Sequence, residues 1–83
     1  MKADEIRTMI TEVIQEIVPD EDVSNLKGDI RIRDQIEMDS MDFLDMLMEL
    51  RKRYNITVPE DDYMKLSTLD GAVTYLEPIM KDV

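Results

Sequence analysis

The most informative segment of this 83-residue chain is residues 39–54, which read DSMDFLDMLMELRKRY. Asp39 at its start, with Asp42 three residues later, forms the D-x-x-D pattern of a capped helix. Apolar side chains then recur at helical spacing. The central stripe consists of Phe43, Leu44, Leu47, Leu50 and Tyr54. Basic residues at 51–53 suit the negative end of a helix dipole, and Asn55 is a typical stop. The segment therefore predicts a helix from Asp39 to about Tyr54.

A second pattern lies beside the apolar stripe of this helix. Met41 and Met48 fall together on one flank. A narrow acidic stripe next to them consists of Asp42, Asp45 and Glu49. Glu49 is spaced to pair with Lys52 and Arg53. The apolar arc is wider than a core requires, so we expect this side of the helix to contact other proteins.

The N-terminal part of the chain predicts another amphipathic helix. Its apolar residues form one continuous stripe at helical period, which consists of Ile6, Met9, Ile10, Val13, Ile14 and Ile17. Asp4 and Glu5 fall in the first turn, where the helix dipole favours negative charge. Pro19 ends this helix, because the residue before a proline is pushed out of the helical region.

Residues 19–39 read as a long loop between these two helices, rich in residues that favour turns. Apolar residues recur in the loop and are expected to reach the core. They are Val23, Leu26, Ile30, Ile32 and Ile36. A short helical turn is expected near Val23–Leu26. A loop of this length in a small domain is often functional.

The C-terminal part predicts two more helices. A short one has Pro59 at its first position and ends near Leu66. The last follows a capping-box pattern at residues 67–70, with Ser67 leading it, and Pro78 interrupts its last turn. Its apolar residues are Leu69, Ala72, Val73, Leu76, Ile79 and Met80. The sequence thus predicts an all-α fold, a four-helix bundle with a short third helix, in a single domain over residues 1–83.

Composition excludes several classes of function. The net charge is −10, with 20 acidic and 10 basic residues, which disfavours binding to nucleic acids and to anionic membranes. The chain has no His, no Cys and only two Gly, so it lacks the residues of a catalytic triad, a zinc site or a glycine-rich phosphate loop. No apolar run is long enough for membrane insertion or a signal peptide. We therefore expect a cytoplasmic protein that is not an enzyme.

Ser40, at the start of the central helix, is the one residue with an evident chemical use. As the first helical residue after a long loop, it should expose its hydroxyl. A nucleophilic serine needs a base to activate it, and neither a His nor a recognisable Ser–Lys motif is present. A hydroxyl that another enzyme modifies needs only exposure and a docking surface. The acidic stripe and the paired methionines lie close enough in sequence to supply that surface.

These segments resemble those of the acyl carrier proteins. The similarity rests on Asp39–Asp42, which corresponds to the family pattern Gly-x-Asp-Ser-Leu, and on the helix that follows. Two downstream segments, residues 56–60 and 66–69, stand in register with the family as well. Length, acidity, helix order and the long first loop agree too, so the resemblance covers essentially the whole chain.

The resemblance implies that Ser40 carries 4′-phosphopantetheine, which a phosphopantetheinyl transferase takes from coenzyme A. The thiol of that arm holds an acyl group as a thioester for fatty-acid, polyketide or lipid biosynthetic enzymes. Asp39 would cap the helix and contact magnesium during transfer. Partner enzymes with basic or mixed-charge patches would dock on Met41, Asp42, Asp45, Met48, Glu49, Arg51 and Lys52. The expected protein is a monomer without a permanent metal site.

The chain departs from the family pattern in three places. Glu37 stands where the pattern has Gly, and Met38 follows it in place of a small residue. Met41 replaces the Leu after the serine. The largest departure is the basic run Arg51–Arg53, since typical fatty-acid carriers are acidic there. Reversed charge at a docking helix disfavours partners with basic patches, which indicates a specialised carrier for a dedicated pathway.

Other interpretations stay open at this stage. A D-alanyl or aminoacyl carrier would share the fold and the serine. An unmodified acidic interaction module would keep its function without Ser40. A calcium sensor fits poorly, because the best loop, starting at Asp20, has Asn25 where Gly is needed and Arg31 where the bidentate Glu belongs.

Overall fold

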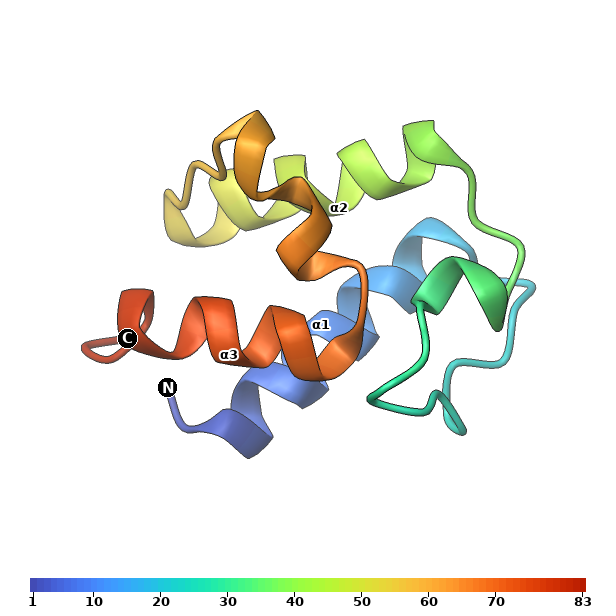
Figure 1. Cartoon of the computed structure of the whole chain (residues 1–83), viewed down its shortest axis with the longest axis horizontal. Helices are drawn as coiled ribbons and strands as arrows, with labels where there is room; N and C mark the ends of the chain where they lie inside the picture. Colours follow the sequence, from blue (N-terminus) through green and yellow to red (C-terminus); the bar gives the residue numbers. More distant parts are fainter.

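A computed structural model describes residues 1–83 and is entirely helical (Figure 1). Three α-helices form its frame: α1 (Ala3–Ile17), α2 (Ser40–Tyr54) and α3 (Leu69–Ile79). Two 3₁₀ segments lie in the connections, η1 (Ile32–Asp34) before α2 and η2 (Glu60–Leu66) before α3. The expected all-α bundle, with a short third helix and a long loop after the first, is therefore confirmed.

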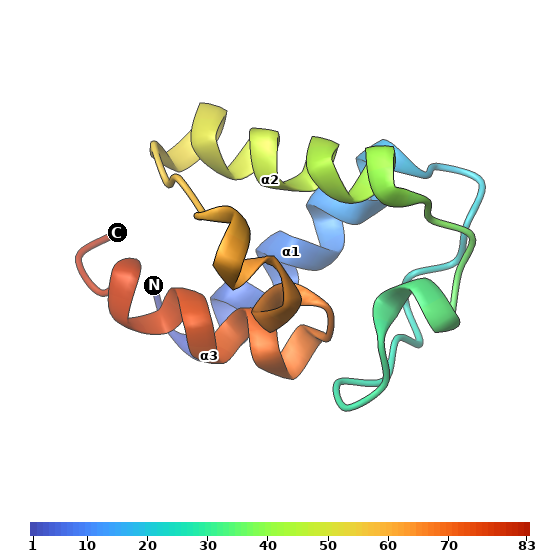
Figure 2. The ribbon, with the colours of Figure 1, turned by 45° about the horizontal axis from the view of Figure 1, so that its top comes forward.

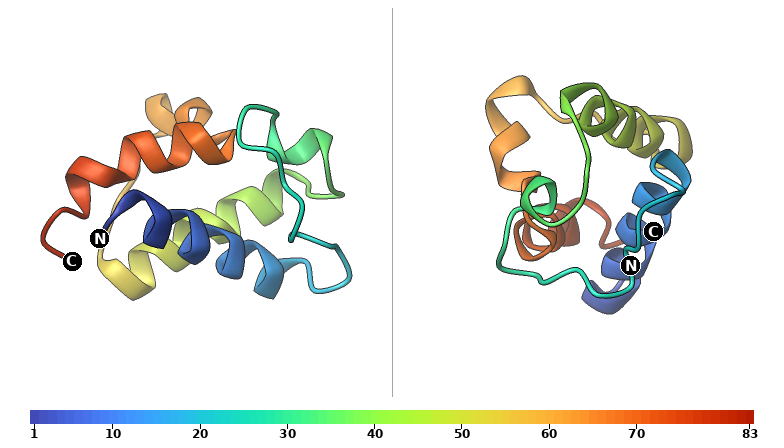
Figure 3. Two further views of the ribbon diagram at one scale, coloured as in Figure 1. Left: turned by 90° about the horizontal axis from the view of Figure 1, so that it is seen from below. Right: turned by 90° about the vertical axis from the view of Figure 1, so that its right-hand side faces the viewer.

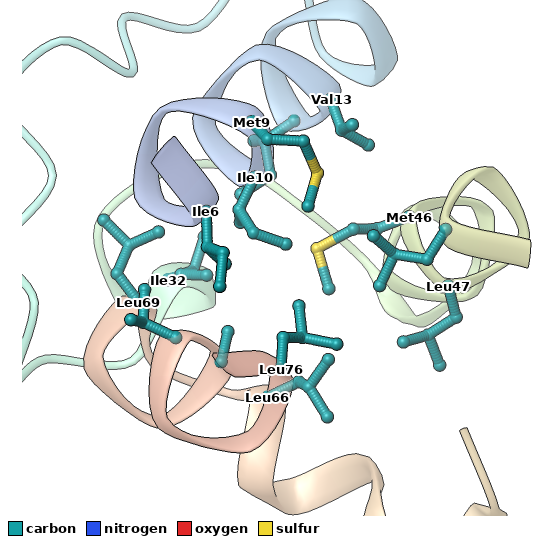
Figure 4. Packing of buried hydrophobic residues seen from close by; sticks show 14 of the residues in the cluster. Ile6, Met9, Ile10, Val13, Ile32, Met46, Leu47, Leu66, Leu69 and Leu76 are labelled. Atoms are coloured by element: carbon teal, nitrogen blue, oxygen red, sulfur yellow. The ribbon is translucent and has the colours of Figure 1, made fainter. Parts of the chain in front are cut away.

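The helices enclose one apolar core. α1 packs against both α2 and α3, while η2 packs against α3 (Figures 1 and 2). The core contains 19 buried residues, and all of them are apolar. In Figure 4, the end of the Met46 side chain of α2 lies between Met9 of α1, above it, and Leu66 and Leu76, below it. No helix is both long enough and apolar enough to cross a bilayer.

The face that α2 turns to the core differs from the predicted stripe. Met46, Leu47 and Leu50 are buried, and Phe43 packs partly against them. Leu44, which the prediction included in the stripe, is 44% exposed, whereas Met46, which it left out, is buried. The buried face thus keeps most of the predicted stripe, but it is rotated toward Met46 and away from Leu44. The error arose because apolar residues surround most of this helix, so periodicity alone left its rotation undecided.

The long loop is ordered by polar contacts from Gln35. Its side-chain amide donates to the carbonyls of Lys27 and Ile30 at 3.0 and 2.8 Å, while its Oε1 accepts from the Lys27 amide. The segment Val23–Leu26, where a short helical turn was predicted, forms a turn at Ser24 and Asn25 but no helix, and the helical element of this loop is η1. Ile32 is buried and its amide donates to the Ser67 carbonyl at 2.9 Å.

The other apolar residues of this loop differ in their burial. Val23 is buried as expected, and Leu26 and Ile36 pack partly against the core. Ile30 was expected in the core as well, but it is 39% exposed. It lies in the bend between the Gly28–Asp29 turn and η1, where the chain changes direction.

The third helix is a 3₁₀ segment, and Pro59 caps it from outside. Pro59 has extended backbone angles (φ −61°, ψ 147°), so it does not occupy the predicted first helical position. The segment is fixed to α3 by Tyr75, whose hydroxyl donates to Asp62 at 2.8 Å. This hydrogen bond lowers the pKa of the Asp62 carboxyl and raises the pKa of Tyr75.

The start of α3 also lies one residue from its predicted place. Thr68 is the N-cap, and its hydroxyl accepts from the Gly71 amide at 2.9 Å. Ser67 cannot take that role, because its helical backbone (φ −70°, ψ −22°) already closes η2. Pro78 lies within the last turn, and α3 ends one residue later at Ile79, in agreement with the predicted interruption.

Candidate functional site

Ser40 is the first residue of α2 and is exposed to solvent. Asp39 precedes it as the N-cap, and its Oδ1 accepts from the Asp42 amide at 2.9 Å. Asp42 reciprocates, since its Oδ2 accepts from the Asp39 amide at 3.3 Å. This capping box, predicted from the sequence, fixes the backbone on both sides of Ser40, and none of its hydrogen bonds uses the serine hydroxyl.

An apolar hollow of about 340 Å³ opens beside Ser40. Phe43 of α2 and Tyr63 of η2 form one wall, with their rings 6.1 Å apart in an edge-to-face arrangement. The full lining consists of Ile32, Arg33, Ser40, Phe43, Leu44, Tyr63, Met64 and Ser67. Three parts of the chain therefore meet here: η1, the first turns of α2, and η2. Figure 3, right, shows η2 flanking α2 on the side away from α1.

Glu37 and Met38, two of the residues that depart from the family pattern, fix the approach to Ser40. The Glu37 amide donates to the Glu21 carboxylate, which ties the approach to the beginning of the long loop. Met38 is buried, with only 6% of its surface exposed. Arg33 reaches back to the same segment, because its Nε donates to the Met38 carbonyl at 3.1 Å. The bulky approach is thus packed and hydrogen-bonded.

The outward side of α2 exposes a row of apolar side chains. Met41 and Met48 are 73% and 63% exposed, and Leu44 lies between them. A second hollow of about 260 Å³ is lined by Leu44, Met48 and Arg51 of α2 together with the extended segment after it. The methionines expected on one flank therefore share an accessible surface.

The acidic stripe of α2 is less uniform than its sequence indicates. Asp42 is engaged in the capping box. Glu49 bonds to Arg53 at 2.9 Å and lies 3.9 Å from the Lys52 ammonium. Hydrogen bonds to Glu16 and Glu49 raise the pKa of the Arg53 guanidinium. Asp45 alone among the three acids is exposed and outside any ion pair.

The structure thus separates the predicted site residues into groups. Ser40, Asp39 and Asp42 come together at the start of α2, whereas Met48 and Arg51 lie along the second hollow. Sequence reasoning missed Arg33, Tyr63 and Met64, which join Ser40 around the first hollow. Tyr63 and Met64 were unassigned residues of the short helix. Arg33 had a detectable signal, a base among the acids of the long loop.

Comparison with known proteins agrees with this geometry. A protein-family model described as "Phosphopantetheine attachment site" matches residues 4–76. An acyl carrier protein of Rubrobacter xylanophilus is 32% identical over 73 residues, covering 84% of this chain and 90% of that protein. One from Brachyspira hyodysenteriae is 34% identical over 56 residues, covering 68% and 72%. One from Lactobacillus johnsonii is 30% identical over 77 residues, covering 93% and 95%.

These matches define the general role. Acyl carrier proteins are non-catalytic, and phosphopantetheine is the group that such a domain holds. The role implies an acyl chain as cargo, a phosphopantetheinyl transferase that adds the arm, and enzymes that act on the acyl group. The chain belongs to the acyl carrier proteins, because the family match covers most of its length and these relatives are at least 30% identical to it.

Proposed function

We propose that Ser40 carries the phosphopantetheine arm, and that the chain delivers acyl groups within a dedicated branch of fatty-acid, polyketide or lipid biosynthesis. The observation that supports the site is the position of Ser40, exposed at the first residue of α2 and lining an apolar hollow. When bound, the arm supplies a terminal thiol that holds the acyl group as a thioester.

Ser40 suits this role better than the other two serines of the chain. The Ser24 hydroxyl donates to Asp22 at 2.5 Å, and the Ser24 hydroxyl and amide together lower the pKa of that carboxyl. Ser67 is half-buried between η2 and α3. Ser40 is exposed, and none of the side-chain hydrogen bonds around the capping box uses its hydroxyl. It is therefore the exposed serine whose hydroxyl is not engaged by a neighbouring carboxylate.

The residues around Ser40 fit an attached phosphopantetheine. The hollow offers apolar walls for the arm, while Arg33 and Ser67 supply polar groups at its edge. Asp39 is exposed and uses one carboxylate oxygen for the cap. Its remaining capacity supports a magnesium contact during transfer, since magnesium binds carboxylate oxygens and keeps several of its waters.

The dedicated pathway is supported by the charge of the docking helix. Arg51 projects beside Met48 along the second hollow and has no acidic partner within the chain. Lys52 is 77% exposed at its side chain. A partner with a basic patch would meet these cations on approach, so a mixed-charge or acidic patch is the better complement.

Intact mass spectrometry tests the attachment site. The protein is incubated with coenzyme A, magnesium and a broad-specificity phosphopantetheinyl transferase. We expect a gain of one phosphopantetheine mass in the native protein, and no gain in Ser40→Ala, because that substitution removes the acceptor oxygen.

Ser24→Ala and Ser67→Ala are the matched controls, and both should gain the same mass as the native protein. Modification that persists in Ser40→Ala, or disappears in one of the controls while the fold is retained, would place the arm elsewhere. A native protein that several transferases leave unmodified would refute the proposal.

A further inference from the structure

Arg33 is held close to Ser40 by the fold. It occupies the middle of η1, whose first residue, Ile32, is buried and bonded to the Ser67 carbonyl. From this fixed segment, Nε of Arg33 donates to the carbonyl of Met38 at 3.1 Å. Met38 stands two residues before Ser40 in the chain. Arg33 and Ser40 also line the same hollow, so the guanidinium stands next to the modification site.

Unlike Arg31 and Arg53, Arg33 has no carboxylate partner. Arg31, two residues earlier, bonds to Asp34 at 3.0 Å, and Arg53 is bonded to Glu16 and Glu49. A guanidinium has five N–H donors, and the contact with Met38 uses only one. In a chain with net charge −10, this places an uncompensated cation with free donors beside Ser40.

The start of α2 is a poor site for a phosphate without such help. Helix N-termini usually offer free amides to anions, but the Asp42 amide already donates to Asp39. The carboxylates of Asp39 and Asp42 add two negative charges directly beside the serine. Both carboxylates would repel a phosphodiester on Ser40, and a nearby cation would offset that repulsion.

We propose that Arg33 binds the phosphodiester of the arm on Ser40 and offsets the repulsion from Asp39 and Asp42. This inference rests on the proposed function of Ser40. The planar guanidinium suits phosphate oxygens, because two parallel N–H donors match two oxygens. The contact with Met38 through Nε leaves the terminal nitrogens available for that pairing. Arg33 is then a residue that binds the prosthetic group and that is not part of the family pattern around the serine.

The test compares the native protein with Arg33→Gln and Arg33→Lys, before and after modification. Arg31→Gln is the matched control. It removes the same charge from the same loop, but the native Arg31 guanidinium pairs with Asp34 rather than with the site. Intact mass first establishes that each protein carries one arm. We then measure the ³¹P shift of the phosphodiester and the Nε–H resonance of Arg33.

We expect the Arg33 resonance to move when the native protein is modified. The ³¹P signal should be displaced in Arg33→Gln, partly restored in Arg33→Lys, and unchanged in Arg31→Gln. The displacement should shrink at high salt, since the contact is exposed. If modification is complete, the ³¹P shift is the same in the native protein and the Arg33 variants, and the Arg33 resonance does not move on modification, the proposed role of Arg33 is wrong. The proposed function of Ser40 would still stand. A native protein that gains no mass would overturn the proposed function and this inference with it.

Discussion

Glu37 and Met38 show how single residues can replace a glycine-containing approach. A Gly before the modified serine lets the chain turn without a side chain to place. Here the Met38 side chain enters the core, and the Glu37 amide is bonded to Glu21. The approach to Ser40 is therefore fixed by burial and by a contact with the distant end of the loop. From sequence these residues were recognised only as departures, because their partners are remote in the chain.

Gly71 is required by a close approach, and its replacement is expected to destabilise the protein. Its backbone angles suit any residue, but a Cβ there would overlap the Lys65 carbonyl oxygen and lie 2.9 Å from the Thr68 hydroxyl oxygen. Forcing backbone apart costs about 1–3 kcal/mol, whereas Ala improves helix propensity by up to about 1 kcal/mol. Gly71→Ala should therefore lower the free energy of unfolding by roughly 1–2 kcal/mol in urea titrations.

The control for Gly71→Ala is Thr74→Ala on the exposed side of the same helix. That change should leave stability unaltered or raise it slightly, because Thr74 is exposed and Ala has a higher helix propensity than Thr. If Gly71→Ala proved as stable as the native protein, the approach of Lys65 to α3 would not be the reason for this glycine.

The features of individual helices that depend on neighbouring residues were predicted correctly from the sequence. The capping box of α2 and its end at Asn55 follow from neighbouring residues, and both agree with the structure, where Asn55 adopts φ 57°. The boundaries of η2 and α3 were shifted because the end of one element sets the backbone of the next. The rotation of α2 depended on packing partners from α1, η2 and α3, which no local pattern reports.

The basic end of α2 is expected to control partner choice. In Arg51→Glu/Lys52→Glu, each substitution removes one positive charge and adds one negative charge, so the net charge changes from −10 to −14. The modified variant should react with a housekeeping fatty-acid synthase on the order of tenfold faster at low salt, since rim charges act mainly on association rates. Measured rates of malonyl loading and chain elongation test this.

A control with the same charge change is Lys27→Glu/Lys81→Glu, because both lysines are exposed and distant from α2 along the chain. It should leave the rates unaltered. If the native protein already matched the Arg51→Glu/Lys52→Glu variant, the charge of this helix would not restrict its partners, and the dedicated pathway would lose its support. Helix loss is a separate outcome that circular dichroism detects, since Lys52→Glu replaces the ammonium beside Glu49 with a second carboxylate.

Across the whole molecule, the negative charge is unevenly distributed. Residues 19–49 contain ten acids and three bases, and the only ion pair among them joins Arg31 to Asp34. The same part of the chain includes the long loop and the start of α2, where Ser40 lies. The site is thus built on the region with the greatest self-repulsion, and its geometry depends on Gln35, Glu21 and buried apolar anchors such as Ile32.

Added salt is therefore expected to stabilise the protein. Screening at physiological ionic strength acts over about 8 Å, which covers neighbouring acids along this loop. A gain of about 1 kcal/mol would raise the melting temperature by roughly 4–8 °C in a domain of this size. Asp20→Asn/Asp29→Asn removes two exposed acids that have no ion-pair partner, so this variant should melt higher at low salt and respond less to added salt. Thermal melts in KCl, and in MgCl₂ at matched ionic strength, provide the measurement. A flat response in the native protein, or an unchanged salt dependence in the variant, would mean that packing rather than charge limits stability.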